Sequence, residues 1–162
     1  MSHKRIHVFT SDVIPFPGCP RSAGGVRSWQ IISALQKERH RVTFSFPLQS
    51  FLAKKVTGEL GKNLSEEIIW CCNNHFFPDQ VIGKIKPDIV VFCNINLLSM
   101  LKKHHPDTII IGDIYGPIHI EDFLMNSRTC LEDDCHQLIE NLRKLDYIIT
   151  VSERQKYFWA AY

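Results

Sequence analysis

The stretch SAGGVRSWQ, residues 22–30, is the part of the sequence that most strongly predicts the fold. It follows a strand-like run, Arg5–Thr10, and opens a helix-like run, Val26–Arg39. A glycine pair at a strand-to-helix turn exposes backbone N–H groups at the positive end of a helix, which favours phosphate. Gly24 and Gly25 are therefore candidate phosphate-binding residues, although glycine also occurs wherever a turn needs a positive φ.

Strand-like and helix-like runs alternate through the rest of the chain. Further runs of Ile, Val and Phe indicate strands at Arg41–Phe46, Asp88–Cys93, Thr108–Ile111 and Tyr147–Val151, and a sixth, shorter run is Glu67–Cys72. Most are continuously apolar, as expected of strands buried on both faces of a parallel sheet. Helical spacing follows Val26, and recurs in Asn96–His104 and Asp133–Lys144. This alternation predicts one α/β domain, residues 1–162, with a doubly wound, mainly parallel, Rossmann-like sheet.

Polar residues directly follow several of the predicted strands. Besides the glycine pair they include Asn94, Asp113 and the Ser152–Glu153 pair. In doubly wound sheets ligands bind beyond the carboxyl ends of the strands, near the point where the strand order reverses. We therefore expect these residues along one edge of the domain, with Asn94 and Ser152 capping the helices that follow them.

The composition is that of an ordinary globular protein. Of 162 residues, 44% are hydrophobic and 22% charged, and the net charge of +2 is too small to indicate a nucleic-acid partner. No apolar stretch approaches the roughly 20 residues of a membrane helix, and the N-terminus does not resemble a signal peptide. The sequence predicts a cytoplasmic protein with no integral membrane segment.

Cysteine and histidine spacing gives little support for a metal site. The six cysteines contain no C-x-x-C pair. The best candidate is the group Cys130, Cys135 and His136, with His119 nearby in sequence, but it lacks standard spacing and an obvious fourth ligand. No metal and no cofactor are predicted.

Several common α/β families are excluded by their motifs. The chain has no G-x-x-x-x-G-K-[ST] phosphate loop, no G-x-G-x-x-G dinucleotide motif and no G-x-S-x-G nucleophile elbow.

Five short motifs, in order, resemble the N-terminal domain of GT-B glycosyltransferases of the retaining type, which use nucleotide-sugar donors. They are Gly24–Arg27, His40–Thr43, Lys86–Val91, Gly112–Glu121 and Asp146–Gln155. The resemblance extends over nearly the whole chain. One departure is Arg39, which stands where a glycine usually precedes the histidine and ends the helix.

The resemblance implies an acceptor-side domain that helps to transfer a sugar from a nucleotide-sugar donor to an acceptor. The donor, the acceptor and the linkage are not identified by the sequence. In GT-B enzymes a second, C-terminal domain carries most nucleotide-sugar contacts, and that domain is absent from this chain. We therefore expect the isolated chain to be inactive, as part of a truncated or split enzyme.

The same resemblance implies roles for individual side chains. The Gly24 and Gly25 N–H groups would face the donor diphosphate, and Arg27 fits either a phosphate contact or a surface salt bridge. Asp113 is the catalytic candidate, through contact with the acceptor hydroxyl or the reacting sugar, or else it caps the following turn. Further candidates for substrate contact are His119, Glu121 and Glu153, each of which also fits a structural or solvated position.

Two other functions remain open at this stage. A non-catalytic Rossmann-like binding or interaction module would share the fold, and an independent nucleotide-binding protein is a third possibility. The Gly-Gly-Val-Arg motif and the turn after Asp113 favour the glycosyltransferase over the third.

Overall fold

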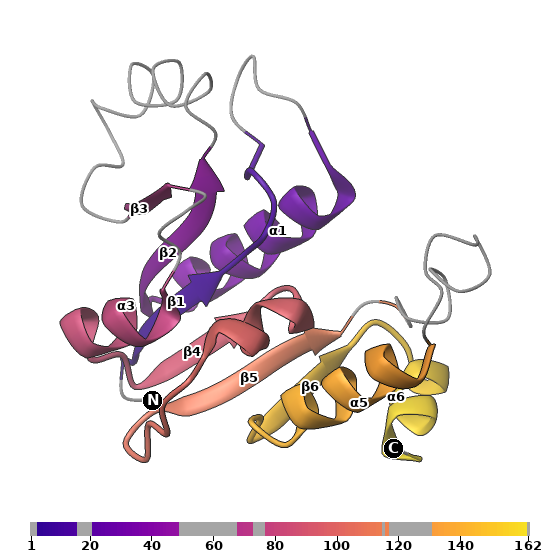
Figure 1. The fold of residues 1–162 in the computed structure, drawn as a ribbon. Helices are drawn as coiled ribbons and strands as arrows, with labels where there is room; N and C mark the ends of the chain where they lie inside the picture. Colours follow the sequence, from indigo (N-terminus) through magenta and orange to yellow (C-terminus); the bar gives the residue numbers. More distant parts are fainter. Residues whose placement is uncertain are drawn as a thin grey trace.

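A computed structural model describes residues 3–15, 21–48, 68–72, 77–114, 116 and 131–161. Strands and helices alternate along these segments. In chain order they are β1 (Arg5–Phe9), α1 (Ala23–Lys37), β2 (Arg41–Leu48), β3 (Ile68–Cys72), α3 (Pro78–Ile85), β4 (Ile89–Phe92), the 3₁₀ helix η1 (Ile95–Met100), β5 (Ile109–Ile114), α5 (Leu131–Leu142), β6 (Tyr147–Thr150) and α6 (Glu153–Ala160) (Figure 1).

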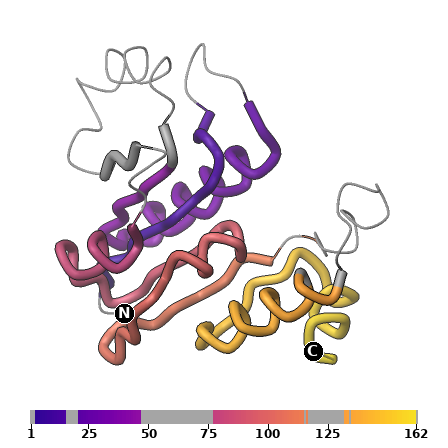
Figure 2. The backbone as a smooth tube through the Cα atoms, viewed as in Figure 1, coloured from indigo at the N-terminus to yellow at the C-terminus, as the bar shows by residue number. Residues whose placement is uncertain are grey.

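The strands form one six-stranded sheet in the order β3-β2-β1-β4-β5-β6, and every neighbouring pair is parallel. The chain winds outward from β1 to β3, then returns to β4 beside β1 and winds to the other side (Figure 2). The switch in strand order therefore lies between β1 and β4, as in the common dinucleotide-binding topology. The predicted α/β fold with a doubly wound parallel sheet is confirmed, including its short sixth strand.

Two hydrophobic clusters hold the layers together. On one face, α1 packs Ile32, which is fully buried, against strand residues such as Val8 and Phe44. On the other face, α3, η1, α5 and α6 cover a second cluster in which Phe9 stacks on Phe92 at 4.9 Å between ring centroids. Because both faces are covered, the central strands are continuously apolar, which is the pattern that predicted them.

The predicted helix at residues 96–104 is wrong in type and extent. The chain forms only the short η1 there, and Leu101 is already extended, with ψ of 110°. The Asp79 carboxylate accepts hydrogen bonds from the N–H groups of Lys102 and Lys103, so these donors are unavailable to continue a helix. Asp79 belongs to α3, a helix that the sequence analysis did not predict and that begins at Pro78.

His7 is a fully buried polar residue in the middle of β1. Its Nδ1 lies 2.8 Å from Thr43 Oγ1 and its Nε2 lies 2.8 Å from Ser45 Oγ, both on the neighbouring strand β2. Burial lowers the pKa of His7 to about 3. The imidazole is therefore neutral near pH 7 and joins β1 to β2 as a satisfied hydrogen-bonding group.

Arg39, the residue that replaces the expected glycine, adopts the left-handed conformation with φ of 62°. Its N–H donates to Gln36 O at 2.9 Å, and the N–H of His40 donates to Leu35 O at 3.2 Å. This is the Schellman arrangement that normally ends a helix with glycine. Arg39 therefore occupies a left-handed position at which a residue without a side chain, glycine, is favoured.

Candidate functional site

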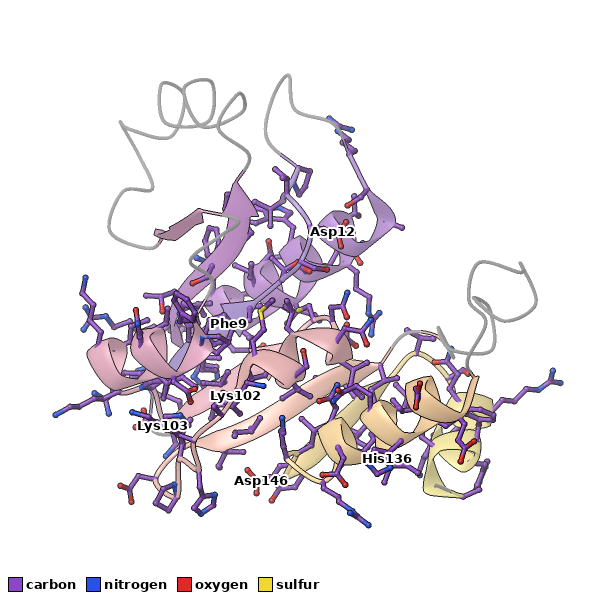
Figure 3. The ribbon with its side chains drawn as sticks, viewed as in Figure 1. Phe9, Asp12, Lys102, Lys103, His136 and Asp146 are labelled. Carbon is purple, nitrogen blue, oxygen red and sulfur yellow. The ribbon has the colours of Figure 1, made fainter. Side chains whose placement is uncertain are left out.

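The candidate site lies at the carboxyl-terminal edge of the sheet, around the switch between β1 and β4. Three segments meet there: residues 10–12 after β1, Cys93 and Asn94 after β4, and the end of β5 with Asp113. The first turns of α1 lie beside them, and Figure 3 shows Asp12 next to that part of the helix. This is the edge on which the sequence predicted a ligand site.

Arg27 and Asp113, both predicted site residues, form an ion pair with each other. Arg27 Nε donates to Asp113 Oδ2 at 2.6 Å, and Nη2 donates to Oδ1 at 2.5 Å. The Asp113 side chain is 0% exposed, whereas the Arg27 side chain is 27% exposed. Both carboxylate oxygens are thus engaged by one guanidinium in a bidentate pair, the strong geometry for this interaction.

Ser28 links α1 to the two central strands below the ion pair. Its buried hydroxyl lies 2.8 Å from Gly24 O, one helical turn back, and 2.9 Å from Thr10 Oγ1 at the end of β1. It also bonds the thiol of Cys93, and burial raises the pKa of that thiol to about 12. Cys93 is therefore protonated near pH 7 and is unsuited to act as a thiolate nucleophile.

A second group of polar contacts crosses the switch point. Asn94 Nδ2 donates to Ser11 Oγ at 2.9 Å, and Ser11 Oγ donates to Asp12 Oδ2 at 3.2 Å. Asn94 also caps η1, because its Oδ1 accepts from the N–H of Asn96 at 2.9 Å. The loop after β1 is thus tied to β4, and the Asp12 carboxylate is held beside the start of α1.

Gly24 and Gly25 lie within the first turn of α1, and not in a turn that precedes it, because Ser22 is the N-cap. The Gly25 N–H donates to Ser22 Oγ at 3.0 Å, so the cap already satisfies this donor. A Cβ added at Gly24 would overlap the Asp12 carboxylate, and one at Gly25 would overlap the backbone carbonyl of Val13. Close approach of the β1–α1 loop, and not a positive φ, explains the glycine pair.

This packing determines which substitutions each glycine tolerates. A bulky residue at Gly25 meets fixed backbone, so the fold would not remain intact around it. At Gly24 the obstacle is the end of a flexible side chain, which moves more easily. A substitution at Gly25 should therefore disturb the fold more than the same substitution at Gly24.

Glu153, another predicted site residue, is not brought to this cluster. Glu153 opens α6 with a side chain that is 76% exposed, and its salt bridge, at 3.6 Å, is to Lys156. Ser152 caps α6 as predicted, accepting from the Gln155 N–H at 3.3 Å. His119 and Glu121 lie outside the described residues.

Thr10, Ser11, Asp12 and Ser28 are members of the cluster that the sequence analysis did not select. Thr10, Ser11 and Asp12 form a polar run directly after a central strand, and that run could have identified them as site residues. Within the described segments, no group of three or more His, Cys, Asp or Glu side chains is arranged to hold a metal ion, and Cys130 lies outside them. No helix in these segments is long and apolar enough to cross a membrane.

The structure was compared with known proteins. The sequence matches no family profile and no curated protein. The fold is similar to that of an alpha-glucosyltransferase solved in complex with UDP and a 13-mer DNA containing a HMU base, with a TM-score of 0.50 and 15% sequence identity. The similarity covers 92% of this chain and 38% of that chain. It shows that this α/β fold is similar to part of a glycosyltransferase.

Proposed function

We propose that this chain is the acceptor-side domain of a glycosyltransferase that uses a nucleotide-sugar donor. In this proposal the carboxyl-terminal edge of the sheet faces the donor diphosphate, and a further domain supplies most contacts to the nucleoside. The order of the sequence motifs, the strand order and the similarity to part of an alpha-glucosyltransferase support it.

The single observation that carries the proposal is the Arg27–Asp113 pair beside the switch point. A fully buried carboxylate fixes two N–H groups of the guanidinium, so the direction of the side chain is set before a ligand arrives. Arginine is the usual partner for phosphate because it offers five donors in a rigid plane. The Arg27 side chain is 27% exposed, and its partner Asp113 is at the carboxyl end of β5, the edge where ligands bind in this topology.

Asp113 acts, in this proposal, by positioning Arg27. Its predicted contact with an acceptor hydroxyl requires an oxygen that a substrate reaches, and both of its oxygens are buried against the guanidinium. Charge developing on the leaving phosphate would be stabilised by Arg27 together with N–H groups at the start of α1, which is electrostatic catalysis. In this proposal the further domain closes over the substrates and excludes water, so residues 1–162 tested by themselves should transfer no sugar.

The experiment is an NMR titration of the ¹⁵N-labelled chain with uridine- and guanosine-diphosphate sugars. We expect weak binding, with Kd on the order of millimolar, and shifts at the Arg27 Nε–H and the first turn of α1. Arg27→Gln should remove these shifts. Arg21→Gln is the matched control, because Arg21 is exposed and precedes the N-cap.

Two outcomes would contradict the proposal. Micromolar affinity for the isolated chain would mean that this domain holds a complete donor site. Shifts that avoid Arg27 and α1 altogether would mean that this edge does not bind phosphate.

One observation favours the alternative of a non-catalytic binding or interaction module. The N-terminus of α1 already has internal partners, since Ser22 bonds the Gly25 N–H and the Asp12 carboxylate lies against Gly24. On this alternative the glycines serve only the packing of the loop, and the titration shows no binding at this edge.

A further inference from the structure

A pocket lies at the amino-terminal edge of the sheet, the edge opposite the candidate site. It has a volume of about 450 Å³ and lies between the C-terminal end of α3, the start of β1 and residues 104–108, which lead into β5. Figure 3 shows Lys102 and Lys103, just before these residues, at the end of the sheet away from Asp12. The volume is within the range of about 300–1,000 Å³ that is typical of small-ligand sites.

Arg5 provides an ordered cation at this pocket. Its backbone N–H donates to Asp88 Oδ2 at 2.8 Å, and its Nη2 donates to Asp88 Oδ1 at 3.1 Å. One carboxylate thus fixes both the strand end and the guanidinium. Among the described residues no other acceptor bonds this guanidinium, and the side chain is 50% exposed.

Lys86 provides a second cation in the lining of the pocket. It is the C-cap of α3 and is left-handed, with φ of 51°, where glycine is usual. Its side chain and that of His104, also in the lining, are exposed and bond no described residue. The neighbouring His105 is held by Asp79, whose Oδ1 lies 2.8 Å from its Nε2.

The two cations of the lining, Arg5 and Lys86, are balanced by the carboxylates of Asp88 and Asp107, and Lys86 forms no ion pair with a described residue. Asp107 is the one carboxylate among the lining residues, and the Asp88 carboxylate is already paired with Arg5. Lys84, in the last turn of α3, adds a further positive charge nearby. The apolar residues of the lining are Pro106, which is exposed, and Ile82 and Pro87, which are largely buried, so Pro106 provides most of the apolar surface for an organic group.

We propose that this pocket binds a small organic phosphate, with Arg5 and Lys86 contacting the phosphate and the apolar wall contacting the rest of the molecule. A guanidinium fixed by a carboxylate and an unpaired ammonium are the contacts that a phosphate group prefers. The site is distinct from the carboxyl-terminal edge and does not depend on the function proposed for that edge.

The test is an NMR titration of the ¹⁵N-labelled chain with glycerol phosphate and with inorganic phosphate. We expect saturable shifts at residues 82–87 and 104–108, and tighter binding of glycerol phosphate than of inorganic phosphate. Lys86→Gln should weaken binding about two- to fivefold, as expected for one exposed ion pair. Lys37→Gln, in the last turn of α1, makes the same charge change at a residue that does not line the pocket, and should have no effect.

The outcomes separate this site from the other edge and from a lipid surface. Shifts confined to the first turn of α1 would overturn this proposal while supporting the one made for the carboxyl edge. Equal weakening by Lys86→Gln and Lys37→Gln would show only general attraction to a positive surface, and would overturn it too. Binding to vesicles of anionic phospholipid, but not to soluble glycerol phosphate, would identify a headgroup site and reject the soluble ligand.

Discussion

Each edge of the sheet carries an arginine–aspartate pair, and the two pairs differ in burial. At the carboxyl edge, Arg27 and Asp113 make a bidentate contact in which the aspartate side chain is 0% exposed. At the amino edge, Arg5 and Asp88 have side chains that are 50% and 36% exposed, and one guanidinium nitrogen makes the contact. The same type of ion pair is therefore buried at one edge of the sheet and exposed to solvent at the other.

Burial decides what each pair does. Desolvation of Asp113 is costly, so its carboxylate is stable in place only while Arg27 is present. Water already solvates the outer pair, and hydrogen bonds from Arg5 lower the pKa of Asp88 without making the fold depend on them. The inner pair fixes a side chain in one direction, whereas the outer pair leaves most of its guanidinium available.

The largest expected effect comes from removing the cation of the inner pair. Arg27→Met leaves the buried Asp113 carboxylate without its partner and should lower the free energy of unfolding by about 3 kcal/mol. Asp113→Asn should cost less, because Arg27 is partly exposed and can turn toward water. Urea denaturation at pH 7 measures both changes.

Arg5→Met is the control at the amino edge. Its effect on unfolding should be small beside that of Arg27→Met, since Arg5 and Asp88 are both solvated. Equal losses from the two variants would show that burial does not distinguish the pairs. The double variant Arg27→Met/Asp113→Asn should recover part of the loss, because no uncompensated charge remains.

The two glycines sharpen the comparison within the carboxyl edge. Gly25→Ala places a Cβ against the Val13 carbonyl and should destabilise the fold by about 2 kcal/mol. Gly24→Ala meets only the end of the Asp12 side chain, and alanine gains up to about 1 kcal/mol of helix propensity over glycine. Thermal unfolding of both variants measures the difference.

Equal destabilisation by Gly24→Ala and Gly25→Ala would contradict this interpretation. If both alanine variants lose stability equally, the Asp12 carboxylate is as rigid as backbone and is a fixed part of the helix start. In a longer protein with transferase activity, Gly24→Ala also tests function, because it changes the ligand edge while the fold is retained.

Much of the fold was predictable from the sequence, for a physical reason. Strands buried on both faces are apolar at most positions, so runs such as Asp88–Cys93 indicate strands without any knowledge of their neighbours. The edge that gathers Asn94 and Asp113 followed from the same pattern. The extent of η1 did not, because it depends on the contact of Asp79 with Lys102, which is visible only after folding.

The contacts inside the candidate site were less predictable. Arg27 and Asp113 are 86 residues apart, and their pairing depends on β5 lying two strands from β1 under α1. The sequence indicated a phosphate contact or a surface salt bridge for Arg27, and a substrate contact or a turn cap for Asp113, but it did not indicate that the two residues pair with each other. Asp12 was not predicted as a site residue. Its position beside Gly24 depends on the path of the loop after β1, which cannot be read from the neighbouring residues in the sequence.

The smallest expected effect lies at the amino edge, where the chain tolerates a strained residue. Arg39→Gly relieves the left-handed conformation at the end of α1, which costs a side chain about 1–2 kcal/mol. Glycine is also more flexible in the unfolded chain, which offsets part of this gain, so the net stabilisation should be about 1 kcal/mol. Glu38→Gly is the matched control, because Glu38 has an ordinary φ of −77° and gains no relief. That control should lose about 0.5–1 kcal/mol, and both changes are measurable as shifts in Tm. If Arg39→Gly destabilises as much as Glu38→Gly does, Arg39 contributes contacts that outweigh its backbone strain, and the sequence departure at this helix end is favourable.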